Sequence, residues 1–231
     1  MVGFAKIRKA ALSRHGEAEL KSRMPAVKSP AALKKTTDDR YLSQMSLRIF
    51  RAGLNHTMVD AKWPAFEEAF HHFDPRRVRA MSDEAVEDLM KDASLIRHLG
   101  KLRAVHANAA AMLALAADKG SFGRYLADWP AEEITGLWAD LAKRFAQMGG
   151  NSAPRFLRMV GKDTFVLTPA VVTALQHWGA FDGEPKSKSD RAKVQAIFNA
   201  WAKETGLPYV HLSRICALSV GENVTDGAAD D

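Results

Sequence analysis

The stretch Gly149-Gly150-Asn151-Ser152 combines residue types that are suited to holding a phosphate. Glycine allows backbone conformations in which consecutive N–H groups point outward, and the N-terminus of a following helix favours an anion. Three cations follow close behind in the sequence, namely Arg155, Arg158 and Lys162. The pattern predicts a turn that grips a phosphate backbone, and the alternative is an ordinary Gly-Gly turn between two helices.

The common short motifs of enzymes with a phosphate loop, a zinc site or a nucleophilic serine are absent from the sequence. It contains no Gly-rich phosphate loop that ends in Lys-Ser/Thr, no His-Glu-x-x-His and no nucleophile elbow. His71 and His72 lack a partner set for a metal, and the single cysteine, Cys216, excludes a disulfide framework and a thiolate-rich metal site. We therefore expect no metal and no cofactor, and one cysteine fits a reducing cytoplasm best. No stretch approaches the ~18 apolar residues that a membrane helix needs, and no secretory leader is evident, so we expect neither membrane insertion nor secretion.

The positive charge of the chain is concentrated at its N-terminal end. The chain has 33 Lys and Arg against 27 Asp and Glu, and residues 1–35 hold nine of these cations and two of the acids. Such a segment commonly meets phosphates through counterion release, and the alternatives are a solvated leader or an organellar leader. We therefore divide the chain into a basic, flexible arm (1–35), a helical domain (36–221) and an acidic tail (222–231).

Apolar residues recur at helical spacing through most of residues 36–221, which predicts an all-α fold. Capping signals support this prediction: Ser82 and Thr168 precede helical patterns, Gly120 follows an alanine-rich one, and Asp190 is expected to cap a further helix. Only residues 165–167 hint at extended structure. The expected helices cover residues 40–51, 58–70, 101–119, 134–147, 152–160, 170–178 and 209–220, with two more after Ser82 and Asp190.

Three stretches carry a resemblance to a known family. The first runs from Ala52-Gly53-Leu54 through Trp63-Pro64-Ala65-Phe66 to His72-Phe73-Asp74-Pro75. The second is Leu95-Ile96-Arg97-His98 with Gly100-Lys101 and Asn108-Ala109, and the third is Met148-Gly149-Gly150-Asn151-Ser152-Ala153 through Val166. Across residues 36–178 the chain resembles the DNA-3-methyladenine glycosylase I family of the helix-hairpin-helix DNA glycosylases, as a divergent member.

The resemblance implies a two-lobed helical bundle that grips DNA through a helix-hairpin-helix element. We place that hairpin at residues 149–152, with Arg155 and Lys162 as added phosphate contacts. Such contacts position a duplex without reading its sequence. The zinc site that the family builds from Cys and His near both ends is absent here, which agrees with the expectation of no metal.

Family members extrude the damaged base and hold it in an aromatic-lined pocket. In the family a glutamate lies four residues before the alanine of Ala52-Gly53-Leu54, and a tryptophan lies two residues after the leucine; here these positions are Arg48 and His56. If Arg48 points into the pocket, it repels a cationic methylated base and suits a neutral or acidic-edged base or a phosphate instead. The alternative is an Arg48 side chain that is turned to solvent beside a core helix. The resemblance makes Arg48 and His56 pocket candidates, with a structural role as the alternative for His56. Tyr41 and Trp63 are candidates for the missing aromatic face, and the alternative is that both belong to the core.

Many related glycosylases place an aspartate at the start of the helix after the hairpin, where it stabilises the sugar cation. Thr168 fills that position in one alignment, and Asp163 fills it in another, in which Asp163-Thr164-Phe165-Val166 matches the Asp-Thr-x-Val string of the superfamily. Asp163 is therefore the catalytic candidate, with a capping or solvated aspartate as the alternative.

The resemblance implies a base excision repair enzyme that hydrolyses the N-glycosidic bond of an alkylated purine, similar to 3-methyladenine, after base flipping. The alternative is a protein of the same fold that recognises damaged DNA or another nucleobase without cleaving it. The implied partner is double-stranded DNA with a damaged base. We expect a monomer in the cytoplasm that associates with the nucleoid when it binds DNA.

Overall fold

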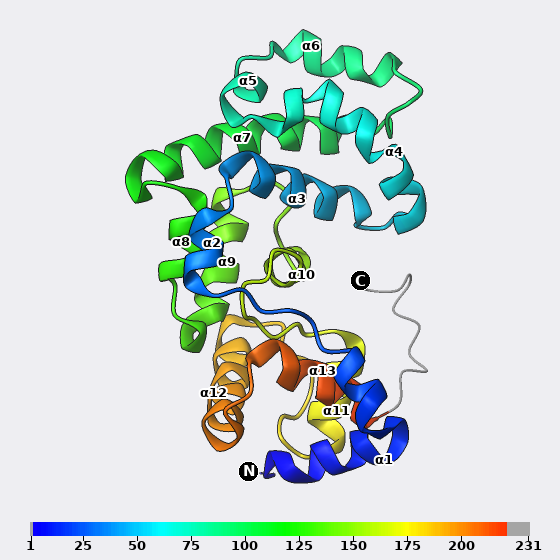
Figure 1. The fold of residues 1–231 in the computed structure, drawn as a ribbon, viewed down its shortest axis with the longest axis vertical. Helices are drawn as coiled ribbons and strands as arrows, with labels where there is room; N and C mark the ends of the chain where they lie inside the picture. Colours follow the sequence, from blue (N-terminus) through cyan, green and yellow to red (C-terminus); the bar gives the residue numbers. More distant parts are fainter. Residues whose placement is uncertain (1, 221–231) are drawn as a thin grey trace. The chain divides into compact units, whose positions relative to one another are not determined.

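The computed structural model describes residues 2–220, and the acidic tail predicted at 222–231 lies outside them. These residues divide into two compact units (Figure 1). The larger unit consists of residues 28–129 and 138–160, and the smaller unit of residues 2–27, 130–137 and 161–220. The described residues form helices and contain no strand, so the prediction of an all-α fold is confirmed.

The larger unit is built around two long helices, α3 (Asp38–Arg51) and α7 (Leu99–Lys119). Helix α3 contacts α7 on one side and α10 on another (Figure 1). Its buried residues Tyr41, Met45, Ile49 and Phe50 face neighbouring helices on several sides, which explains why the helix is apolar around much of its circumference. The other elements are α2 (Pro30–Lys35), α4 (His56–Ala69), η1 (His71–Phe73), α5 (Pro75–Arg79), α6 (Asp83–Asp88), η2 (Leu89–Lys91), α8 (Phe122–Asp128), the end of α9 (Ile134–Arg144) and α10 (Ser152–Met159).

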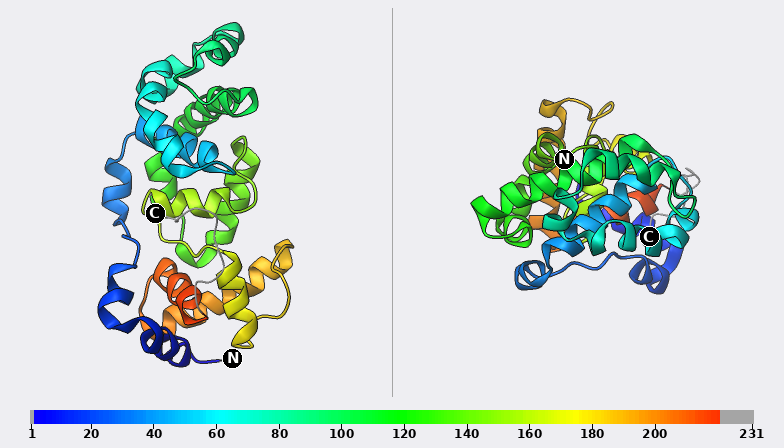
Figure 2. Two further views of the ribbon diagram at one scale, coloured as in Figure 1. Left: turned by 90° about the vertical axis from the view of Figure 1, so that its right-hand side faces the viewer. Right: turned by 90° about the horizontal axis from the view of Figure 1, so that it is seen from above.

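The smaller unit collects segments from both ends of the described chain. Helix α13 contacts α1, α11 and α12, and Figure 2 shows these helices grouped together. The buried rings of Phe165 and Phe198 stack in parallel with their centroids 4.3 Å apart, and they form part of its core. The elements are α1 (Phe4–Ser22), η3 (Ala131–Glu133), the start of α9, α11 (Pro169–His177), α12 (Lys188–Thr205) and α13 (Tyr209–Ser219).

Capping explains where several of these helices begin and end. The Ser82 and Thr168 side chains accept hydrogen bonds from the N–H groups of Ala85 and Val171, and Gly120 ends α7 with φ of 85°. These three predictions are confirmed. The prediction for Asp190 is wrong, because Ser187 caps α12 instead and its hydroxyl accepts the N–H of Asp190. The predicted extended segment 165–167 is buried but forms no strand.

The N-terminal segment differs from the flexible arm that its charge suggests. Most of residues 2–27 belongs to α1, which packs against α13, and residues 30–35 form α2, which packs against α8. Phe4, Ile7, Ala11 and Leu20 are buried on α1. The high density of lysine and arginine hides this apolar stripe, and its burial is the physical reason that the segment is helical.

Helices α2 and α8 approach each other closely at Gly123. A Cβ atom at this position would lie 2.4 Å from the Leu33 carbonyl oxygen and 3.1 Å from the Tyr41 ring. A contact of this kind with backbone cannot be relieved by turning a side chain. Only glycine allows this packing.

We therefore expect Gly123→Ala to destabilise the protein by about 2 kcal/mol, because one methyl group overpacks the α2–α8 contact. Gly100→Ala is the matched control, since Gly100 is also the second residue of its helix but its Cβ would meet only side-chain atoms, of His98 at 3.4 Å and of Gln147 at 3.8 Å. The control change is expected to be neutral or stabilising. Urea unfolding of both variants measures the difference, and equal effects would contradict the steric argument.

Candidate nucleic-acid interface

The predicted hairpin lies in the larger unit between α9 and α10. Gly149, Gly150 and Asn151 are exposed, and no heavy atom lies within 4 Å of a Cβ atom built on either glycine. Gly150 has a φ of 59°, which glycine adopts without steric cost. Ser152 begins α10, and the partly exposed Arg155 follows on its first turn. The turn thus presents its backbone to solvent on an open surface, with the partly exposed Arg155 close to it in the sequence.

Helix α7 holds the segment that leads into this turn. The fully buried Asn108 amide donates to the carbonyl of Ala146 (3.2 Å) and accepts the N–H of the same residue (2.7 Å). One residue later, the Gln147 side chain donates to the Gly100 carbonyl (3.0 Å). Gln147 has a φ of 60°, a left-handed conformation that is uncommon for a residue with a side chain. Two side-chain bridges therefore fix the start of the hairpin to α7.

The same helix holds the end of α3. The Lys101 ammonium donates to the carbonyls of Phe50 (3.2 Å) and Ala52 (2.7 Å), which are at the C-terminus of α3. It also lies 5.9 Å from the centroid of the Phe50 ring. Carbonyls at a helix C-terminus lack intrahelical partners and favour a cation. Lys101 therefore anchors the turn Ala52-Gly53-Leu54.

Arg48 lies on the last turn of α3 and is 8% exposed, so its side chain is not turned to solvent. Burial lowers the pKa of Lys101, and the positive charge of Arg48 lowers it further. Two cations therefore influence each other at the end of α3.

His56 and Trp63 lie on the neighbouring helix α4, and both are partly exposed. His56 is the first residue of α4, directly after the cap Asn55. The Trp63 ring stacks nearly parallel on Phe66 and Phe73, and its indole N–H donates to the Ser43 hydroxyl (3.2 Å). The Ser43 hydroxyl in turn donates to the Glu67 carboxylate (2.6 Å). This carboxylate also accepts hydrogen bonds from both terminal nitrogens of Arg40. Trp63 is thus an aromatic ring held in one orientation with part of its surface accessible.

Tyr41 occupies a different environment from the one expected. It is fully buried, its hydroxyl donates to the Leu33 carbonyl (2.8 Å), and its ring packs 5.1 Å from that of Phe122. Burial raises the pKa of its hydroxyl. Tyr41 joins α2, α3 and α8, and no face of its ring is open to a ligand in this structure.

Three predicted residues lie in the smaller unit: Lys162, Asp163 and Thr168. Lys162 is 7% exposed, so its side chain is not displayed on the surface as a phosphate contact would require. The partly exposed Asp163 carboxylate accepts the N–H groups of Tyr209 (3.1 Å) and Val210 (3.0 Å) at the start of α13. Thr168 is buried and caps α11. Asp163 is thus oriented by two backbone hydrogen bonds, while Thr168 has a structural role.

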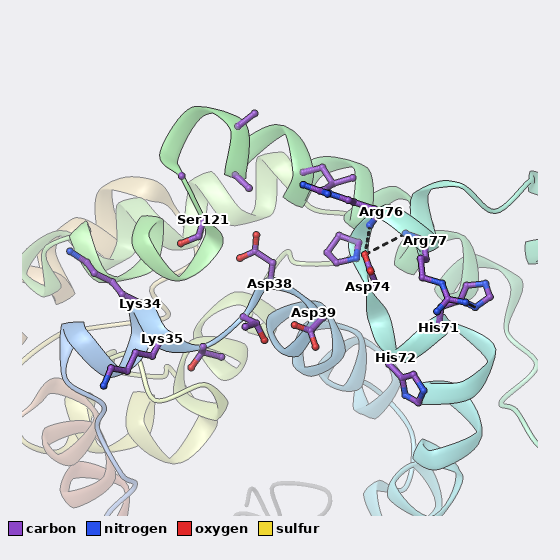
Figure 3. A pocket seen from close by; sticks show the side chains of 17 residues that line it. Lys34, Lys35, Asp38, Asp39, His71, His72, Asp74, Arg76, Arg77 and Ser121 are labelled. Atoms are coloured by element: carbon purple, nitrogen blue, oxygen red, sulfur yellow. Dashed lines mark hydrogen bonds between the residues drawn. The ribbon is translucent and has the colours of Figure 1, made fainter.

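A cavity of about 880 Å³ opens elsewhere on the larger unit, at the start of α3 and the end of α7. Figure 3 shows Lys34 and Lys35 on one side, His71, His72 and Arg77 on the other, and Asp38 between them. None of the predicted pocket residues lines it. The part of the chain that the structure describes contains no cluster of three or more His, Cys, Asp and Glu side chains that could hold a metal. It also contains no helix long and apolar enough to span a membrane.

The arrangement of helices matches that of solved DNA glycosylases. The crystal structure of a 3-methyladenine DNA glycosylase I aligns with a TM-score of 0.50 and 27% identity, over 62% of this chain and 85% of that one. The 8-oxoguanine glycosylase/lyase of Methanocaldococcus jannaschii, solved with DNA containing 8-oxoguanine, aligns with a TM-score of 0.54 over 92% of this chain. Its identity of 14% makes it a likeness of fold alone. The prediction of an all-helical fold similar to that of DNA glycosylases is confirmed.

The sequence comparisons identify the branch within this class. The family model for methyladenine glycosylases matches residues 32–153, which is more than half of the chain, so the chain belongs to that family. The DNA-3-methyladenine glycosylase 1 of Escherichia coli (strain K12) is 44% identical over 78 residues. That match covers 33% of this chain and 42% of the relative, so the chain matches less than half the length of this curated relative.

The roles of Asn108 and Lys101 were not evident from the sequence. Both residues belong to the sequence motif that carries the family resemblance, but a sequence motif does not show what a side chain contacts. The sequence signal that could have revealed these roles is an asparagine and a lysine in a helix predicted to be buried. Polar atoms that are buried must find hydrogen-bond partners.

We expect Asn108→Ala to destabilise the protein by about 2 to 3 kcal/mol, because it leaves both backbone groups of Ala146 without their partner. Gln147→Ala is the control, since it removes a solvent-exposed hydrogen bond of the same segment and should cost less than about 1 kcal/mol. Urea denaturation provides the measurement. A loss for Asn108→Ala no larger than that of the control would show that the buried bridge does not hold the hairpin.

Proposed function

We propose that this protein is a DNA glycosylase of base excision repair that hydrolyses the N-glycosidic bond of an alkylated purine, similar to 3-methyladenine, after flipping it from the duplex. The observation that carries the proposal is the family match over residues 32–153, which includes both the α3–α4 turn and the hairpin. The contacts of Lys101 and Asn108 support it, because they hold these two parts on one helix.

In the proposed reaction the hairpin binds the phosphate backbone. Open glycines and Arg155 suit this task, since backbone N–H groups and a guanidinium both favour phosphate oxygens. The extruded base is held near Arg48, His56 and Trp63, where the oriented indole offers an aromatic surface. An alkylated purine is a good leaving group, so modest stabilisation of an oxocarbenium-like sugar suffices without a metal or cofactor.

We assign that stabilisation to Asp163. Its carboxylate is oriented by two N–H groups of α13, and the side chain remains partly exposed. A carboxylate in a fixed orientation can stabilise a developing positive charge and orient a water molecule. The partner is double-stranded DNA with a damaged base. We further propose that the protein acts as a monomer in the cytoplasm and associates with the nucleoid when it binds DNA.

Arg48 favours a second candidate, in which the same fold recognises a neutral damaged base or distorted DNA without cleavage. A guanidinium donates to acceptor atoms on a base edge and repels a methylated base that is cationic. Because Arg48 is buried beside Lys101, this preference is built into the end of α3.

Base release from alkylated duplex DNA tests the function directly. We expect the wild-type protein to release a methylpurine, and we expect Gly150→Pro to abolish release, because proline cannot adopt the φ of 59° found at this turn. Arg48→Glu should raise the release of 3-methyladenine by about tenfold or more, since it replaces a repulsive charge with an attractive one worth at least ~1.4 kcal/mol. Chromatography of the released bases provides the measurement.

Arg48→Gln serves as the neutral control and should give an intermediate rate. Circular dichroism of each variant separates a change in chemistry from a loss of fold. Duplex binding without release of any alkylated base by the wild type would overturn the enzymatic proposal and support the recognition protein.

The catalytic role of Asp163 makes a separate prediction. Asp163→Asn retains one acceptor for the N-terminus of α13 but lacks the negative charge, so we expect base release to fall at least about a hundredfold, in line with the loss of one stabilising group at a reaction centre. The midpoint of thermal unfolding should fall only slightly. Single-turnover assays measure the rate, and a variant with wild-type release would leave Asp163 as a capping residue only.

A further inference from the structure

The exposed side of α1 carries a dense set of cations that the family match does not include, since that match begins at residue 32. Five Lys and Arg side chains of this helix are exposed, and they take part in no hydrogen bond or ion pair within the described part of the chain. They are Lys6, Arg8, Lys9, Arg14 and Lys21. The acids of the helix are Glu17 and Glu19, and Glu19 already pairs with Arg23 (2.6 Å).

Helix α1 is firmly docked on the smaller unit. The N–H of Phe4 donates to both carboxylate oxygens of Glu204 (3.0 and 3.1 Å), and the Phe4 ring lies 5.3 Å from that of Trp201. The Trp201 indole also donates to the Val2 carbonyl (3.1 Å). Ile7 and Ala11 continue the buried stripe against α13. Lys6, Arg8, Lys9 and Arg14 are therefore displayed by a docked helical segment that precedes the break at Gly16. Little backbone entropy is lost when they meet a ligand.

The partner that fits this surface is an extended polyanion. At 1.5 Å per residue, Lys6 and Arg14 are separated by about 12 Å along the regular part of α1. Lys21 lies beyond a break in the helix at Gly16 (φ 74°, ψ 166°). This spread of charge matches more than one phosphate rather than a single ion. A lipid surface fits less well, because a helix that binds a membrane must insert its apolar face. The apolar face of α1 is already buried against α13.

We propose that α1 is a second DNA-binding element, which holds the phosphate backbone through Lys6, Arg8, Lys9, Arg14 and Lys21 in addition to the hairpin. This inference rests on the proposed function, because it assumes that the protein acts on duplex DNA. Its contacts carry no base information, so α1 adds affinity and salt dependence but no preference for damage.

The salt dependence of duplex binding tests this proposal. The variant carries glutamine at all five positions, and fluorescence anisotropy of the full chain with an undamaged duplex gives the affinity at several salt concentrations. Each phosphate contact contributes roughly 0.9 to the slope of log affinity against log salt concentration. If at least three of the five side chains engage, the magnitude of the slope should decrease by roughly 2.7 or more, with an unchanged unfolding midpoint.

Two further variants make the result specific. The charge-matched control changes Lys91, Lys119, Lys186, Lys193 and Lys203 to glutamine and should leave most of the slope intact. Phe4→Ala keeps every charge but weakens docking of α1, and it should reduce affinity less than the five-site variant does.

The outcomes separate this proposal from the enzymatic one. An unchanged slope in the five-site variant overturns the role of α1 in DNA binding. Base release by the same variant then shows that the glycosylase activity does not depend on these cations. No duplex binding by the wild type overturns both. Binding of the wild type to anionic phosphatidylglycerol vesicles or to an RNA duplex, lost in the variant while the DNA slope is unchanged, would assign α1 to that partner and overturn the DNA proposal.

Discussion

Two polar side chains on one face of α7 position the parts of the larger unit that the family shares. Lys101 and Asn108 are seven residues apart, which is close to two helical turns, so they project from the same side of the helix. One binds the carbonyls at the end of α3, and the other binds both backbone groups of Ala146 before the hairpin. Because both are buried, leaving either without its partners would carry the full cost of desolvation.

This constraint explains why an alanine-rich helix carries a distinctive string of polar residues. Alanine lets α3, α5, α6 and α8 pack closely around α7, and the two polar side chains then fix the ends of neighbouring segments. Arg48 lies in the part of α3 that this arrangement positions. A change of charge at that residue can therefore alter the preferred ligand while the helical frame is retained.

Much of the fold could be predicted from the sequence, because capping residues and apolar spacing act over a few residues. Ser82, Thr168 and Gly120 are examples of such local signals.

The fold of the N-terminal segment could not be predicted in this way, since lysines and arginines outnumber the apolar residues that fix α1 on α13. The site was less predictable still. Tyr41 and Trp63 are both aromatic residues at helical spacing, and only packing distinguishes the buried ring from the accessible one.

The pairing of Phe4 with Glu204 and Trp201 also has a consequence for how the protein is made. These residues are separated by about 200 positions in the chain. At a synthesis rate of roughly 5 to 20 residues per second, the apolar stripe of α1 leaves the ribosome about 10 to 40 s before its partners on α12 and α13. Until α12 and α13 are synthesised, the apolar stripe of α1 has no partner. The dense positive charge of α1 then favours solubility and limits association with other nascent chains.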